Sequence, residues 1–161
     1  MSISGQNSDT YTVKIYSTRL LFPLWFFKHL HIVTEHDGII NRYEVSGRMS
    51  KNHPQSIGGF VFKNLLPPTT GLFIVAAKNP LEGFGPRWPI KLESKISGGE
   101  GTAAHTLYSF IESEKILSYP YAHDYDVIKG PNSNTFVQWV INQVPQANLK
   151  LPMSAWGKNS K

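Results

Sequence analysis

The sequence predicts a single α+β domain, in which an antiparallel sheet of about five or six strands packs against two main helices. Three observations favour this fold. Short β-rich segments separated by Gly- and Pro-containing turns fill most of the chain up to residue 97. Two helix-length segments, each with one apolar face, follow. The 161 residues, of which 40% are hydrophobic, are enough for one core but not for two large ones.

Six segments have the alternation or the composition of strands. The first, residues 10–17, alternates apolar and polar side chains. An Asp-Gly pair, Asp37 and Gly38, separates two β-rich segments and predicts a hairpin. Residues 49–59 and 79–88 are polar or rich in Gly and Pro, which predicts loops. The expected strands cover residues 10–17, 30–35, 39–46, 60–66, 72–77 and 90–97, with 60–66 at an edge.

Two segments have helical periodicity. Residues 102–117 place their apolar side chains on one face, and Thr102 is a suitable N-cap. Residues 119–129 are expected to be extended, because a Tyr-Pro-Tyr sequence opposes a helix. The second helix is expected to begin at Asn132 or Ser133 and to end near Pro145. Its apolar stripe consists of Phe136, Val137, Val140, Ile141 and Val144.

The ends and the composition limit the classes of function. Residues 1–9 are polar and predict a flexible lead to a single domain over residues 10–158. No signal-peptide pattern is visible, so we expect a cytoplasmic protein. The net charge is +5, but Lys and Arg are scattered, so no nucleic-acid partner is expected. The chain has no Cys, which excludes disulfides, zinc–thiolate sites and a thiol nucleophile.

An apolar segment, LLFPLWFF at residues 20–27, invites comparison with a membrane element. It is far shorter than the ~20 residues that a spanning helix needs, and it contains Pro23. We therefore expect a buried connector and no transmembrane segment. The alternative is a weak contact with a membrane surface through Trp25, Phe26 and Phe27.

The beginning of the second helix is the best candidate for a functional site. Ser133 would lie there, beside free backbone N–H groups and the positive end of the helix dipole. A nucleophile at such a position needs a general base. His29, with His31 as the alternative, lies on a predicted strand. Asn-Ser-Asn-Thr before an apolar helix is equally an ordinary capping sequence, and caps are far commoner than nucleophiles.

In the hydroxyl–imidazole hypothesis, Glu44 or Tyr43 on the paired strand orients the base, and the backbone N–H groups of Ser133 and Asn134 hold an oxyanion. His29 and His31 are two apart on one strand, so they face the same side. A metal site on these imidazoles lacks an evident third ligand, and neither a metal nor another cofactor is expected.

The order of these parts resembles the permuted papain-like superfamily, which includes lecithin-retinol-acyltransferase-like proteins. KHLHIVTEHDGIINRYEV corresponds to its strand pair and GPNSNTFVQWVINQVP to its helix. The chain is more similar still to a bacterial family of unknown function with a YEV strand, a GPNSNTF signature and an LPMSAWGK-like tail. The resemblance covers about residues 27–158. Ser133 stands where that superfamily usually has Cys, and a hydroxyl must lose its proton to a base during attack.

Three alternatives follow: the resemblance implies the first two, and the net positive charge and the LLFPLWFF segment suggest the third. The first is a serine-variant hydrolase or acyltransferase acting on an amide or ester, with His29 as base, Glu44 as orienting group and Ser133 as nucleophile. Asn132 or Asn134 would help to fix the substrate, beside His31 and Tyr43. The second is a catalytically inactive papain-like module that binds a peptide, a glycan or a protein. The third is a polyanion- or membrane-surface-binding protein.

Overall fold

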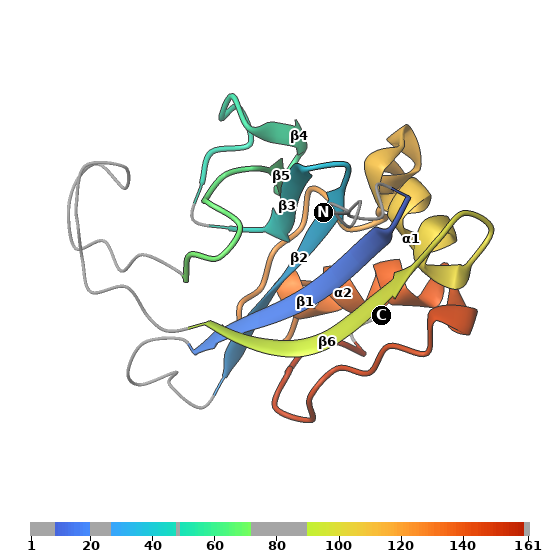
Figure 1. Ribbon diagram of the computed structural model, residues 1–161. Helices are drawn as coiled ribbons and strands as arrows, with labels where there is room; N and C mark the ends of the chain where they lie inside the picture. The colour runs from blue at the N-terminus through green and yellow to red at the C-terminus, as the bar shows by residue number, and fades with distance from the viewer. Residues whose placement is uncertain (1–8, 20–26, 48, 72–89, 160–161) are drawn as a thin grey trace, which may run out of the picture.

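The computed structural model describes residues 9–19, 27–47, 49–71 and 90–159 of the chain. It forms one α+β fold, in which a six-stranded antiparallel sheet has the order β4-β5-β3-β2-β1-β6 (Figure 1). The strands are β1 (Tyr11–Arg19), β2 (Lys28–His36), β3 (Ile39–Val45), β4 (Ser56–Gly58), β5 (Val61–Lys63) and β6 (Ile90–Gly98). The helices are α1 (Ala103–Glu112) and α2 (Ser133–Asn142), with two short 3₁₀ helices, η1 (Glu114–Ser118) and η2 (Pro145–Ala147). The predicted fold class is confirmed.

The β2–β3 hairpin is the centre of the sheet, and its turn confirms the prediction from the Asp-Gly pair. Asp37 has a φ of +49° and Gly38 a φ of +74°. Two successive positive φ values give the turn whose twist matches the flanking strands. The register then pairs Ile32 with Tyr43 and Val33 with Arg42. This register decides which side chains of the two strands share a face.

Three local expectations were wrong. Residues 49–59 contain the short strand β4, which pairs with β5, so the segment predicted as an edge is covered on its outer side. The predicted helix over 102–117 ends at Ser113, whose hydroxyl accepts from Lys115 N and begins η1. Residues 119–129 form turns at 120–123 and 127–129, joined by a short irregular segment, instead of a continuous extended chain. The predicted strand over 72–77 and loop over 79–88 lie outside the described residues.

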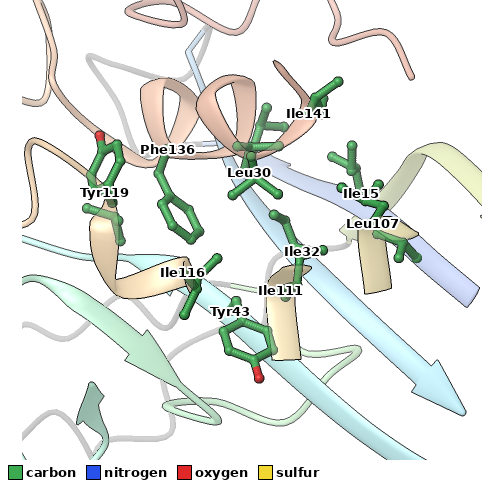
Figure 2. Close-up of a cluster of buried hydrophobic side chains, with 14 of the residues drawn as sticks. Ile15, Leu30, Ile32, Tyr43, Leu107, Ile111, Ile116, Tyr119, Phe136 and Ile141 are labelled. Atoms are coloured by element: carbon green, nitrogen blue, oxygen red, sulfur yellow. The ribbon is translucent and has the colours of Figure 1, made fainter. Parts of the chain in front are cut away.

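One face of the sheet carries the apolar core. Leu30 and Ile32 of β2 point from the sheet toward the helices, and Phe136 of α2 meets them (Figure 2). Leu107 and Ile111 of α1 complete this layer and are fully buried. Both helices therefore pack on the same face, as their single apolar stripes require.

The opposite face is buried as well, but it is polar. Arg42 and Glu44 flank Tyr43 along β3, so alternation places them on the side away from the helices. Their exposed fractions are 0% and 1%. Among the described residues, no helix is long and apolar enough to cross a membrane.

Candidate functional site

The first turn of α2 is closed by its own side chains. Asn132 is the N-cap, and its Oδ1 accepts from the backbone N–H groups of Asn134 and Thr135. The backbone N–H of Asn132 donates in turn to Thr135 Oγ1 at 3.1 Å. This is a complete capping box, so the capping function predicted for the sequence is confirmed. It also occupies the Asn134 N–H group that the catalytic hypothesis assigned to an oxyanion.

Ser133 lies beside strand β2, as the catalytic hypothesis requires. Its Oγ accepts from Leu30 N at 3.4 Å, and the side chain is buried, with 3% exposed. The strand and the helix start, more than one hundred residues apart in sequence, are therefore neighbours. The hydroxyl oxygen, however, is hydrogen-bonded to the backbone of the strand and, among the described residues, not to an imidazole.

His29 pairs with Glu44, the first of the two orienting groups expected from the sequence. Its Nε2–H donates to Glu44 Oε2 at 2.9 Å. Arg42 supports the same carboxylate, with Nε 2.8 Å from Oε1 and Nη2 3.0 Å from Oε2. Burial alone would raise the pKa of Glu44, but the Arg42 charge and the His29 hydrogen bond lower it to about 2. Glu44 is therefore ionised at neutral pH.

Glu44 and Tyr43, the two orienting groups expected from the sequence, lie on opposite faces of β3. The His29 ring bonds Glu44 on the face away from the helices, whereas Tyr43 points to the helix side and donates to Glu112 Oε2 at 2.8 Å. Among the hydrogen bonds of the described residues, none joins the His29 ring to Ser133 Oγ. The structure thus brings His29 to Glu44 and Ser133 to the backbone of the same strand, as two separate contacts.

His31, the alternative base, is a neutral imidazole inside the protein. Its Nε2 lies 3.2 Å from the Pro68 carbonyl oxygen, which can only accept, so the ring proton is on Nε2. Burial, reinforced by the Arg42 charge, lowers the pKa of His31 to about 3. Nδ1 is buried, and among the described residues it has no hydrogen-bond partner. The ring also stacks on Tyr16.

The two asparagines proposed for substrate binding attach the C-terminal tail to the helix. Asn134 Nδ2 donates to the carbonyl oxygens of Lys28 and Trp156, both at 2.8 Å. Asn132 Nδ2 lies 3.4 Å from the Trp156 carbonyl oxygen as well. Thr135 Oγ1 donates to the Gly157 carbonyl oxygen. GPNSNTF and the WGK tail, both quoted for the resemblance, are therefore in direct contact.

A narrow pocket opens at this junction. Its walls come from β2, the segment before α2, the helix start and Trp156, and they include His29 and Ser133. It has room for about one water molecule. Phe27, proposed for membrane contact, is buried here and packs edge-on against Trp156, whereas Trp25 and Phe26 lie outside the described residues. Among the described residues, no group of three or more His, Asp or Glu could hold a metal ion.

Two residues that the sequence analysis did not select are central to this site. Arg42 neutralises Glu44, and its position two residues away on one strand was a usable signal, since such residues share a face. Trp156 forms part of the pocket and accepts two asparagine hydrogen bonds. Its contact with α2 could not be inferred from sequence spacing.

Comparison with known proteins gives one match. Residues 77–160, just over half of the chain, match a family described as "Protein of unknown function (DUF3750)". The match contains α1, α2 and the tail, whereas His29 and Glu44 precede it. No curated protein and no solved structure matches the chain. On the extent of this match, the chain belongs to the DUF3750 family.

Proposed function

We propose that this chain is a papain-like module that binds a peptide segment of a partner and does not use Ser133 as a nucleophile. The observation that carries the proposal is the hydrogen bond from Leu30 N to the buried Ser133 Oγ. A serine nucleophile must give its proton to a base within hydrogen-bond reach. The imidazole of His29 donates to Glu44, and among the described residues no hydrogen bond joins it to Ser133 Oγ.

The electrostatics of the helix start support the same conclusion. An oxyanion site needs N–H groups that point at the reacting oxygen and have no other acceptor. The N–H groups of Asn134 and Thr135 already donate to Asn132 Oδ1. The adjoining pocket has room for about one water molecule, which is too little for the carbonyl and flanking atoms of an amide substrate. Ser133 thus links α2 to β2 through its hydrogen bond with Leu30 N. We assign peptide binding to the surface around this contact.

The serine-variant hydrolase remains the second candidate, because one observation favours it. His29 and Glu44 form a hydrogen-bonded imidazole–carboxylate pair, and both His29 and Ser133 contribute to the walls of one pocket.

Labelling with a fluorophosphonate probe separates the two candidates, because the probe reacts with activated serines. We expect no difference in labelling between the wild type and Ser133→Ala, measured by intact-protein mass spectrometry. An exposed serine, Ser97→Ala, provides the matched control variant. Labelling of the wild type that disappears in both Ser133→Ala and His29→Ala, but not in Ser97→Ala, would establish the hydrolase and refute the proposal.

A further inference from the structure

The start of α2 already holds a peptide segment, namely the tail of this chain. The Trp156 carbonyl oxygen accepts from Asn134 Nδ2 at 2.8 Å and from Asn132 Nδ2 at 3.4 Å. The next carbonyl oxygen, that of Gly157, accepts from Thr135 Oγ1. Three side chains of one turn thus bind two successive backbone carbonyl groups. This arrangement recognises a polypeptide through its main chain, whatever its other side chains are.

The site requires glycine at the second of these two positions. Gly157 has a φ of +79°, a conformation that glycine adopts far more readily than other residues. A Cβ at this position would also lie 2.5 Å from Asn132 Nδ2, one of the two amide donors. Two positions earlier, Ala155 is buried, which leaves room for a small side chain only.

The residue between these two positions is aromatic. The Trp156 ring packs edge-on against Phe27, with the ring centroids 5.1 Å apart. Phe27 is buried, whereas Trp156 is 55% exposed. An aromatic side chain of a bound segment therefore meets an aromatic ring of the domain on one side. The pattern that the site accepts is a small residue, an aromatic residue and then glycine.

The tail does not satisfy the hydrogen-bonding groups of the site completely. Asn134 Nδ2 has two acceptors, but Asn134 Oδ1 is buried and, among the described residues, has no hydrogen-bond partner. A buried acceptor without a donor lowers the stability of the state that contains it. An occupant that brings an N–H group to this oxygen can therefore compete with the tail.

The tail also lacks the backbone pairing that holds the strands in place. Residues 152–159 contain neither helix nor strand. The Ala155 N–H and the Lys158 ammonium group both donate to the Pro152 carbonyl oxygen, so these hydrogen bonds lie within the segment. Met153 is 93% exposed. Such a segment can leave the start of α2 by local opening, without separation of the strands.

We infer that the turn of residues 132–135 is the peptide-binding site of this module, that the tail occupies it as an internal competitor, and that the partner supplies a segment with a small residue, an aromatic residue and glycine in succession. The inference rests on the proposed function and names its site and the class of its partner. A tethered segment has a high effective concentration, so the open site is a minor state and a partner binds with reduced apparent affinity. Weakening the tail should raise that affinity.

Fluorescence anisotropy with a fluorescein-labelled peptide of residues 152–159, PMSAWGKN, tests the inference on the full chain. Gly157→Ala forces a Cβ against Asn132, and we expect this variant to bind the peptide at least about tenfold more tightly than the wild type. Gly101→Ala is the matched control, because Gly101 also has a positive φ but has no atom within 4 Å of its Cβ position. Equal affinities of Gly157→Ala and the wild type, or binding to neither, would overturn the inference.

Two changes then establish where the peptide binds. A peptide that itself carries Gly157→Ala should bind the Gly157→Ala chain at least about tenfold more weakly than PMSAWGKN does. Adding Asn134→Ala to the Gly157→Ala chain should weaken binding of PMSAWGKN by a similar factor, because it removes the amide that binds the Trp156 carbonyl oxygen. Binding that either change leaves unaltered would place the peptide elsewhere and contradict the inference.

Hydrogen exchange of the wild type tests the release of the tail without any variant, and it decides the matter if urea denaturation shows that Gly157→Ala is unfolded. The Ala155 amide donates within the tail, and the Phe136 amide donates within the first turn of α2. After correction for intrinsic rates, we expect the Ala155 amide to exchange at least about tenfold faster than the Phe136 amide. Equal protection would show that the tail leaves only on global unfolding, which is incompatible with the inference.

Light scattering determines whether the segment comes from a second copy of the chain. A wild-type dimer that Gly157→Ala abolishes would assign the site to the tail of that copy and would overturn the partner. Serine labelling by the fluorophosphonate probe would refute the proposed function without changing these peptide affinities, so the two failures are distinguishable.

Discussion

The buried His31 makes a quantitative prediction about acid stability. Its folded pKa of about 3 lies well below its ordinary value of 6.5. Because the pKa of His31 is lower in the folded chain, its imidazole is protonated in the unfolded chain and neutral in the folded chain between pH 6.5 and about 3. The contribution of His31 to stability is therefore complete above pH 6.5 and falls as the pH decreases toward the folded pKa.

The magnitude follows from the linkage between protonation and folding. Each pH unit in this interval costs ~1.4 kcal/mol for one such group. Lowering the pH from 6.5 to about 4.5 should thus remove about 2–3 kcal/mol of folding free energy through His31 alone. This is a large part of the total for a domain of ordinary stability.

The assay compares the wild type with His31→Gln in urea denaturation followed by tryptophan fluorescence. Glutamine keeps an N–H donor for the Pro68 carbonyl but does not titrate. The variant is expected to be less stable at neutral pH, since it loses the stacking on Tyr16, yet to lose about 2–3 kcal/mol less on acidification. Equal losses in both proteins would show that His31 is protonated in the fold and would refute the reasoning.

Three further predictions concern the polar contacts around the site, each measured as a free energy of unfolding in urea. Glu44→Gln should cost about 3–5 kcal/mol, because it leaves the buried Arg42 charge without its partner; a cost below ~1 kcal/mol would contradict this. Asn134→Asp should cost more than Asn134→Ala, since a carboxylate would face two carbonyl oxygens that the amide now binds, and the reverse order would be inconsistent. Gly157→Ala should cost more than Gly101→Ala, because both residues have positive φ but only at Gly157 would the new Cβ meet another side chain, at 2.5 Å; equal costs would show that the tail yields there.

Secondary structure and hairpin register followed from local features of the sequence. The Asp37-Gly38 turn, the Thr102 cap and the Asn132 cap each depend on residues a few positions apart, so local chemistry determines them. The break at Ser113 and the strand β4 were missed. β4 is three residues long and forms only because β5 lies beside it, which no local pattern contains.

In the candidate site, too, some features follow from local spacing and others only from tertiary contacts. That His29 and His31 share a face was predicted from their spacing. The same rule places Tyr43 and Glu44 on opposite faces, although both had been offered as the orienting group. That the polar face is buried as well was not evident, because polar side chains on alternate positions of a strand ordinarily face solvent. The tertiary structure pairs the His29 imidazole with Glu44 and the Ser133 hydroxyl with the backbone of β2.

The amino-acid sequence by itself determined that this protein has an α+β fold and that α2 begins with a capped Asn-Ser-Asn-Thr turn. Only the tertiary structure decided what that turn does. Asn134 and Thr135 bind carbonyl groups of the tail, Ser133 accepts from β2, and Trp156 is left exposed between them. The physical reason is that capping is a local interaction, whereas the remaining donors and acceptors of the turn are satisfied by segments distant in the chain, whose position depends on the packing of the whole sheet.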